Sequence, residues 1–242
     1  NPAYGGATMG TGYSVKIVGK VKLSKLHKLS DRIEAELAEV NRQMSTWDEG
    51  SEISRFSRSR ALEPFECSEA FATVVQRALE LSESTGGAFD PTLQPLLNLW
   101  GFGSGGEGYR IPTDDEIEGV RQITGWEKLK VDAASNLVKT EPETSLALGA
   151  IAKGYGVDVL ARLLDEAGFE NWFAEIGGEV VVRGLNPEGV PWRIGIEYPS
   201  TNPMDDRLQG VVHMTNGAVA TSGNYHNFIE EDGRIYSHIL DP

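Results

Sequence analysis

The chain has 242 residues and a formal net charge of −14 at pH 7, which argues against a nucleic-acid ligand and against non-specific docking on anionic lipid. No apolar run approaches the ~20 residues that span a bilayer. A single cysteine, Cys67, excludes an intrachain disulfide and a cysteine-cluster metal site, and so low a cysteine content fits the cytoplasm and an export compartment equally well.

The first part of the chain predicts a strand and then a long helix. Residues 7–19 form a glycine-rich turn that leads into an alternation of apolar and polar side chains, as in a strand. Apolar residues then recur every three or four positions from Leu26 to Met44, which predicts the clearest helix of the chain. A polar segment follows as far as Phe56, and we expect it to be a loop. Trp47 in this loop could stack on a planar ring, although a lone aromatic residue more often serves packing.

The middle of the chain carries several signals for helix starts. Ser68 predicts the cap of a second helix, which breaks at Gly86-Gly87. Asp90-Pro-Thr92 could open a short helix with proline at its first position. Thr113-Asp-Asp-Glu116 matches a capping box and predicts a third helix. Residues 127–138 are typical of a pair of strands.

The segment Leu146-Ala-Leu-Gly-Ala-Ile-Ala-Lys-Gly-Tyr-Gly-Val-Asp158 begins the next predicted helix, for which Gly168 is a plausible end. Gly149 and Ala150 present little side chain, so a ligand can approach the backbone closely. A helix N-terminus offers unpaired N–H groups and a positive dipole end, both suited to phosphate, and Lys153 adds a charge one turn later. The alternative is a buried helix start with small residues for packing and one solvated lysine.

The last third of the chain is rich in strands. Residues 172–182 predict a strand interrupted by Gly177-Gly178, where a bulge or a close backbone approach is expected. Residues 192–199 predict another strand, and residues 225–239 predict a hairpin around Asp232-Gly233. Because helices and strands follow one another without regular βαβ alternation, the sequence favours the α+β class.

Few residues of this chain are arranged for common hydrolytic chemistry. None of the four histidines forms a His-x-x-His or His-Glu-x-x-His pair, which excludes a zinc-hydrolase motif. Thr221-Ser-Gly223 lacks the flanking glycine of a serine-hydrolase elbow. Asp90 and Asp241 both precede proline, which restricts the backbone and would hold a carboxylate in place, although Asp-Pro is also common in turns. His238 lies near a strand end, where a histidine is either structural or available for catalysis.

Nine short segments, collinear from residue 9 to the last residue, carry a family resemblance. They are Met9-Gly-Thr11; Met44-Ser-Thr-Trp47 with Ser51-Glu-Ile-Ser-Arg-Phe56; Gly87-Ala-Phe-Asp-Pro91; Leu97-Asn-Leu-Trp-Gly-Phe102; Leu148-Gly-Ala-Ile-Ala-Lys-Gly-Tyr155; Gly177-Gly178; Trp192-Arg-Ile-Gly-Ile196; Ala220-Thr-Ser-Gly223; and Tyr236-Ser-His-Ile-Leu-Asp-Pro242. Together they resemble the ApbE family, the bacterial FAD:protein FMN transferases. The resemblance implies an α+β fold of mixed, mostly antiparallel sheets flanked by helices. It also implies a single flavin transferase domain over residues 1–242, with two intertwined subdomains as the alternative.

The activity that this resemblance implies is a magnesium-dependent transferase reaction with FAD as substrate. The FAD pyrophosphate is cleaved, FMN is attached by a phosphoester to a Ser or Thr of an acceptor flavoprotein, and AMP is released. The resemblance also implies an exported, lipid-anchored protein of the bacterial periplasm at the inner membrane. Two other activities stay open: a flavin-binding or carrier protein without turnover, and an FAD pyrophosphatase that yields FMN and AMP.

The resemblance further assigns expected roles to single residues. His238 would take the proton from the acceptor hydroxyl, since imidazole exchanges protons readily near neutral pH. Lys153 and the helix start would hold the FAD phosphates, and the backbone carbonyl of Ala150 would be a Mg²⁺ ligand. The remaining expected contacts with FAD are made by Met9, Trp47, Ala88, Phe89, Asp90, Ala147 and Ile239.

Two departures from the family pattern affect these expectations. The family usually has Asp where this chain has Ala147, so a carboxylate expected to hydrogen-bond the nucleotide is missing. Relatives also continue beyond the position of Pro242 with a segment that supplies Asp and Thr ligands to magnesium. From the residues given, Ala150 and Asp241 are the expected ligands, and we expect weak Mg²⁺ binding.

Overall fold

The computed structural model describes residues 1–200, 202, 204, 206–225 and 227–242. They divide into two compact units, each made of two separate stretches of chain. Unit 1 contains residues 1–41 and 153–226, and unit 2 contains residues 42–152 and 227–242. No helix in the described part of the chain is long and apolar enough to cross a membrane.

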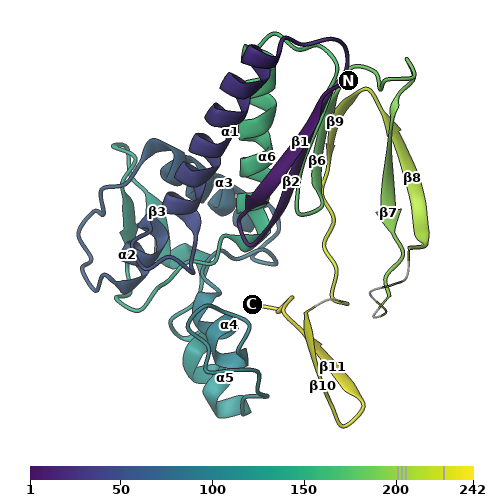
Figure 1. The fold of residues 1–242 in the computed structure, drawn as a ribbon. Coiled ribbons are helices and arrows are strands. Elements are labelled where there is room, and N and C mark those ends of the chain that lie inside the picture. The colour runs from purple at the N-terminus through teal and green to yellow at the C-terminus, as the bar shows by residue number, and fades with distance from the viewer. Residues whose placement is uncertain (201, 203, 205, 226) are drawn as a thin grey trace. The chain divides into compact units, whose positions relative to one another are not determined.

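Unit 1 is built on a five-stranded antiparallel sheet with the strand order β1-β2-β5-β6-β9 (Figure 1). The strands are β1 (Ala3–Thr8), β2 (Thr11–Ile17), β5 (Trp172–Ile176), β6 (Glu179–Arg183) and β9 (Asn216–Val219). The strand predicted within residues 7–19 is confirmed as β2. β1 was not predicted because it contains glycines. A Cβ at Gly5 would lie 2.3 Å from the carbonyl oxygen of Tyr13, so this strand pair needs glycine there.

The core of unit 1 lies between this sheet and two helices, α1 (Leu23–Met44) and α6 (Gly149–Glu166) (Figure 1). Both helices were predicted, and both continue across the division between the units. Their apolar stripes and the inward side chains of β2 and β5 are buried, as amphipathic helices on a sheet require. The largest of these buried side chains are Ile17, Ile33, Leu37, Leu160, Leu163 and Trp172.

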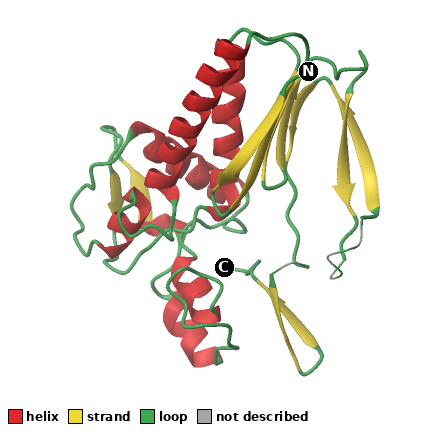
Figure 2. Cartoon of the chain, viewed as in Figure 1, coloured by secondary structure: helices red, strands yellow, loops and turns green. Residues whose placement is uncertain are grey.

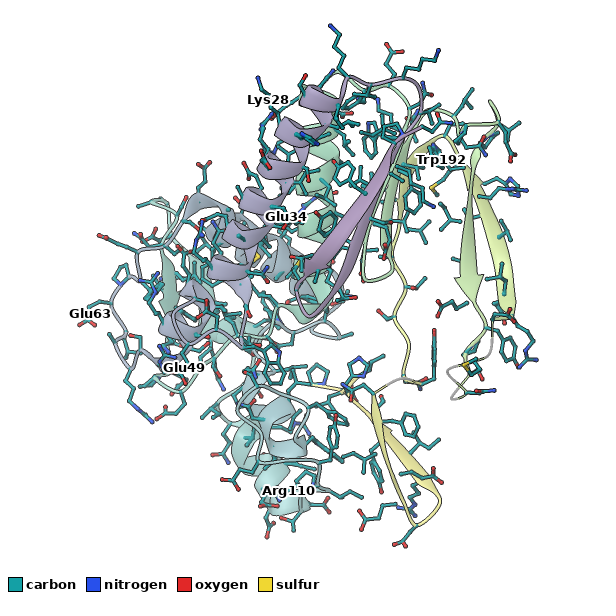
Figure 3. All side chains as sticks on the ribbon, in the orientation of Figure 1. Lys28, Glu34, Glu49, Glu63, Arg110 and Trp192 are labelled. Atoms are coloured by element: carbon teal, nitrogen blue, oxygen red, sulfur yellow. The ribbon has the colours of Figure 1, made fainter. Side chains whose placement is uncertain are left out.

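A smaller cluster of buried residues covers another face of unit 1. β7 (Trp192–Glu197) and β8 (Leu208–Met214) form a two-stranded antiparallel sheet. Trp192, which Figure 3 labels, and Ile194 of β7 pack with Val180 and Val182 of β6. This contact fixes the outer side of β6, the strand that begins at Glu179.

The glycine pair between β5 and β6 is a hairpin turn and not an interruption of one strand. Gly177 and Gly178 have φ angles of 53° and 97°, which L side chains rarely adopt. Residues on either side pair across the turn, with Ile176 opposite Glu179. The prediction of a single strand with a bulge was therefore wrong, because the two left-handed glycines reverse the chain.

Unit 2 contains four helices outside α1 and α6, together with two small hairpins, within the residues described (Figure 2). The elements are α2 (Glu52–Arg58), α3 (Glu69–Ser84), α4 (Gln94–Trp100), α5 (Asp114–Arg121), a short 3₁₀ helix (Trp126–Lys128), β3 (Leu129–Val131), β4 (Leu137–Lys139), β10 (Phe228–Glu231) and β11 (Arg234–Ser237). The predicted Ser68 cap and the predicted capping box at Thr113 are confirmed. The hairpin around Asp232-Gly233 is also confirmed.

Two local predictions in unit 2 were wrong. The polar segment before Phe56 contains α2, because the side chain of Ser51 accepts the N–H of Ser54 and caps a helix there. The helix expected at Asp90-Pro-Thr92 begins only at Gln94. Asp90 accepts the backbone N–H of Thr92, which makes this segment a turn.

The one cysteine of the sequence precedes the cap of α3. Cys67 is half-buried, and its Sγ lies 3.6 Å from the carbonyl oxygen of Ser135. Burial, with a smaller effect from the Glu52 carboxylate, raises the pKa of the thiol to about 11. The thiol is therefore protonated at neutral pH.

Candidate functional site

Lys153 lies on α6 in unit 1, against the turn between β5 and β6. Its Nζ is 2.8 Å from Oε2 of Glu179 and donates a hydrogen bond of 3.2 Å to the carbonyl oxygen of Gly177. The lysine side chain is 33% exposed. The ammonium group therefore has two fixed partners in its own unit and keeps access to a ligand.

Met9 lies in the β1–β2 turn, where Met9 and Gly10 both have positive φ angles. Its sulfur packs against α6 at Gly156: a Cβ added to this glycine would lie only 3.1 Å from Met9 Sδ. Gly156 is three residues after Lys153 on the helix, so the two positions share a helix face. The structure thus brings two predicted site residues, Met9 and Lys153, to the same side of α6.

The start of α6, in unit 2, is anchored by the residues that precede it. Leu146 and Leu148 are fully buried, and Ala147 between them is half-buried. The N–H of Ala147 donates a 2.8 Å hydrogen bond to the carbonyl oxygen of Pro91. Two of the predicted motifs, which are distant in sequence, are therefore joined through their backbones.

The exposed first turn of α6 has the chemistry of an anion site. Gly149 and Ala150 are both exposed, and the first N–H groups of any helix have no partner within the helix. These groups and the positive end of the helix dipole favour a phosphate. The alternative of a buried helix start with small residues for packing does not fit Gly149 and Ala150, because both are exposed.

Asp90 is buried, and both oxygens of its carboxylate have partners in unit 2. Oδ1 accepts the N–H and the hydroxyl of Thr92 at 2.7 and 2.6 Å, and Oδ2 accepts the N–H of Trp126 at 3.0 Å. The Thr92 hydroxyl in turn accepts the N–H of Gly125 at 2.7 Å. Asp90 thus shapes the turn that carries its neighbours.

The other predicted contacts with FAD in unit 2 lie at accessible positions. Ala88 is exposed. Phe89 is half-buried, and its N–H donates a hydrogen bond of 3.1 Å to the Thr85 hydroxyl. Trp47 is 77% exposed, so its ring is not packed in a core. Ile239 is also exposed, next to His238. An exposed tryptophan side chain suits stacking on a planar ligand better than it suits packing.

His238 follows β11, and the backbone of Asn227 orients its ring. Nδ1 lies 3.0 Å from the carbonyl oxygen of Asn227. A carbonyl oxygen can only accept, so Nδ1 carries the proton in this contact and Nε2 of the neutral ring is unprotonated. Nε2 is therefore the nitrogen that can accept a proton.

One aromatic side chain of unit 2, Phe102, contacts this histidine, and a second, Tyr109, contacts Phe102. The Phe102 and His238 rings meet edge to face, with 6.3 Å between the ring centroids. The Phe102 and Tyr109 rings are tilted against each other, with 5.4 Å between the centroids. The Tyr109 hydroxyl donates to Oδ1 of Asn227 at 3.2 Å. These contacts join the predicted Leu97–Phe102 segment to the segment that contains His238.

The sequence model of the ApbE family matches residues 9–242. This chain belongs to the ApbE family. An FAD:protein FMN transferase of Vibrio cholerae is 45% identical over 98% of this chain and 70% of its own length. The solved flavin transferase ApbE of Vibrio cholerae has a TM-score of 0.89 and 44% identity over 99% of this chain and 75% of that one. The apo flavinyl transferase ApbE of Pseudomonas stutzeri has a TM-score of 0.86 and 37% identity, with coverages of 99% and 73%.

These ApbE relatives confirm the predicted family, the α+β fold and the predicted class of enzyme. The roles of the single site residues stay predictions. Sequence analysis missed Asn227, Tyr109 and Glu179. Asn227 acts on His238 through a backbone carbonyl, for which a sequence has no signal, whereas Glu179 directly follows the glycine pair that was noted.

A magnesium site in this ApbE chain would have an incomplete set of protein ligands. In the described part of the chain, no three His, Cys, Asp or Glu side chains gather to hold a metal. Mg²⁺ prefers hard oxygen donors and often keeps waters and substrate phosphates beside one or two carboxylates. The Ala150 carbonyl and the exposed Asp241 have the right chemistry, but two donors are too few for a protein-built site.

Proposed function

We propose that this chain transfers the FMN half of FAD to a Ser or Thr hydroxyl of an acceptor protein and releases AMP. The observation that carries this proposal is the orientation of His238, whose Nδ1 faces a carbonyl oxygen so that Nε2 can accept a proton. The names of the relatives, FAD:protein FMN transferases, support the same reaction. The acceptor would be a flavoprotein subunit that presents its hydroxyl in an accessible segment.

In the proposed reaction, the acceptor hydroxyl oxygen forms a bond to the phosphorus on the FMN side of the pyrophosphate. The bond between that phosphorus and the bridging oxygen breaks, and AMP leaves with the bridging oxygen. The hydroxyl proton moves to Nε2 of His238. The Asn227 carbonyl then faces the N–H of an imidazolium, which stabilises the charged ring.

FAD binding would rest on the start of α6 and on Lys153. Phosphoryl transfer depends mostly on positioning and charge neutralisation, and backbone N–H groups and an ammonium supply both. Met9, Trp47, Ala88, Phe89 and Ile239 would contact the ring systems. Asp90 would hold the turn that carries Ala88 and Phe89, since its own oxygens already have partners.

Magnesium dependence is part of the proposal and rests on the family resemblance. The Ala150 carbonyl and Asp241 are the donors that this chain would offer. A bound Mg²⁺ supplies neutralisation of phosphate charge.

The second candidate is a protein that binds FAD without turning it over. Ala147 favours this candidate because its methyl group replaces a carboxylate expected at that position. Its N–H donates to the carbonyl oxygen of Pro91, and an N–H donor could not replace the acceptor oxygens of a carboxylate.

A mass-spectrometric assay with FAD, Mg²⁺ and an acceptor fragment that carries a threonine tests the proposal. A mass gain of one FMN together with AMP release is the expected result. AMP without a mass gain, with or without acceptor, would instead indicate an FAD pyrophosphatase. Bound FAD with neither product would indicate a binding protein, and Ala147→Asp would then be expected to restore transfer. An acceptor with alanine in place of its threonine is the control.

We also propose a location in the bacterial periplasm, as a lipid-anchored protein of the inner membrane, on the family resemblance alone. Fractionation of cells that express the full natural protein tests this location.

A further inference from the structure

We infer that Glu179 is a positioning residue that holds the Lys153 ammonium ready for the phosphates of FAD. This inference rests on the proposed function, because it assigns a role to the partner of a proposed phosphate-binding lysine. Two oxygen atoms lie next to the Lys153 ammonium, the Gly177 carbonyl and the Glu179 carboxylate, and only the carboxylate carries charge.

The Glu179 carboxylate is placed to act on this lysine. Its side chain is 13% exposed, and Oε2 is shielded from solvent. Oε2 accepts no hydrogen bond of good geometry within the described residues, and its ionic partner is the Lys153 ammonium at 2.8 Å. A buried carboxylate is costly without a counter-charge, so this ion pair holds both groups together.

The turn before Glu179 is shaped around the lysine stem. A Cβ at Gly177 would lie 2.7 Å from Thr11 Cγ2 and 3.3 Å from Lys153 Cδ. Gly178 donates its N–H to Oε1 of Glu175 at 2.8 Å, which holds the turn from the strand before it. The N–H of Gly177 also bonds the carbonyl oxygen of Gly12 at 3.0 Å. The turn is therefore fixed on two sides, and the acceptors for Lys153 are fixed with it.

A fixed ammonium binds phosphate better than a mobile one. A lysine side chain loses much rotamer freedom when it is ordered, and Glu179 orders it before the substrate arrives. Nζ has three N–H groups. One of them is donated to the Gly177 carbonyl, and Glu179 is the ionic partner of the ammonium, so donor capacity is left for a phosphate oxygen. Without Glu179 the ammonium gains solvent-facing conformers, so we expect weaker phosphate binding.

The test is a double-mutant cycle of Glu179→Gln and Lys153→Met, measured by titration with three probes. FAD contains flavin and pyrophosphate, ADP contains the pyrophosphate without flavin, and riboflavin contains flavin without phosphate. Glu188→Gln, an exposed glutamate of unit 1, is the control for the change of charge. Glu179→Asp keeps the carboxylate on a shorter stem.

We expect Glu179→Gln to raise the Kd of FAD and of ADP by about three- to tenfold, the scale of one partly exposed ion pair, and to leave that of riboflavin unchanged. In the Lys153→Met background the same change should have no effect, and Glu179→Asp should recover part of the affinity. Tighter ADP binding by Glu179→Gln would overturn the inference, because the carboxylate would then compete with phosphate. An equal loss for riboflavin would also overturn it and indicate a general structural role.

The cycle separates failure of this inference from failure of the proposed function. If Lys153→Met weakens ADP binding and Glu179→Gln does not, the inference alone is wrong. If Lys153→Met changes no Kd, the proposed role of Lys153 is wrong, and the inference falls with it.

Discussion

Two regions of unit 2 contribute to the proposed chemistry, and they are built differently. The segment before α6 is fixed between two fully buried leucines, Leu146 and Leu148, and bonds other segments through its backbone. The β10–β11 hairpin, which leads to His238, has no fully buried side chain among its described residues. The first region suits substrate binding, which needs a preformed surface, and the second suits a group that must meet a variable acceptor.

Lys139 shows how strongly the first region is held. Its Nζ is buried and donates to the carbonyl oxygens of Phe56 and Thr144 at 3.2 and 3.0 Å. The N–H of Leu146 meanwhile donates to the Ser57 hydroxyl at 3.2 Å. In the hairpin, by contrast, the ring of Tyr236 packs on Trp100 at 5.4 Å. If this contrast is correct, mutations should separate FAD binding from transfer.

The largest effect should come from His238→Ala. Loss of the proton acceptor should lower FMN transfer by about 10²- to 10⁴-fold, while FAD binding stays unchanged because the hairpin does not form the helix start. Transfer is measured by acceptor mass, and binding by flavin fluorescence. His213→Ala, on exposed β8, is the control. Normal turnover by His238→Ala would remove the assignment of the base.

Lys153→Ala should weaken FAD binding more than it slows transfer. Loss of a charged hydrogen-bond donor costs about 1.5–3 kcal/mol, so the Kd of FAD should rise by about 10- to 100-fold. Transfer at saturating FAD should fall less than affinity does. Lys130→Ala, an exposed lysine of β3, is the control. An unchanged fluorescence titration would show that the lysine does not hold the phosphates.

Lys139→Met tests the anchoring of the first region. The change removes both hydrogen bonds of the ammonium; the Thr144 carbonyl loses its donor, whereas the Phe56 carbonyl keeps the N–H of Ser59 at 3.2 Å. Unfolding in urea should show a loss of about 1–3 kcal/mol. Burial lowers the pKa of Lys139 from its usual 10.5. As the pH rises through the folded pKa toward 10.5, the unfolded state binds more protons, so the native protein gains stability that the variant lacks.

The stability deficit of Lys139→Met should therefore grow between neutral pH and about pH 10. Lys130→Met is the matched control, since this lysine is exposed and should show neither effect. A deficit that is independent of pH would mean that burial does not perturb Lys139.

The smallest effect should come from Tyr109→Phe, which removes the hydroxyl bonded to Asn227. A neutral hydrogen bond contributes about 0.5–1.5 kcal/mol, so transfer should slow by about 2- to 10-fold as His238 becomes less well oriented. FAD affinity should not change. Tyr236→Phe keeps the ring contact with Trp100 and serves as the control. Weaker FAD binding by Tyr109→Phe would contradict the separation of the two regions.

The sequence predicts best where a signal is local. The helix start at Ser68 and the capping box at Thr113 depend on side chains within one turn, and both were predicted correctly. The β5–β6 hairpin was misassigned because a glycine pair in a sequence is compatible both with a bulge inside one strand and with a turn between two strands. Only the backbone angles of Gly177 and Gly178 distinguish the two.

The candidate site was predictable as residues but not as contacts. The motif resemblance named Lys153 and His238, whereas the pairing of Lys153 with Glu179 and the contact of His238 with Asn227 depend on tertiary structure. The expected contact of Asp90 with FAD stays a prediction, and the structure adds that its carboxylate accepts the Thr92 hydroxyl and the backbone N–H of Trp126. A side chain's type indicates its chemistry, but its partners decide whether that chemistry is available.

Because the half-buried thiol of Cys67 reacts slowly, a cysteine introduced into the β10–β11 hairpin can be labelled selectively. Thiol reagents attack the thiolate, and an exposed cysteine has an ordinary pKa of about 8.5, well below the value of about 11 for Cys67. A cysteine introduced at Ile235, an exposed position of β11, should therefore react with a maleimide dye far faster than the native thiol does. A single fluorophore could then report how the hairpin responds to an acceptor protein, without removal of Cys67.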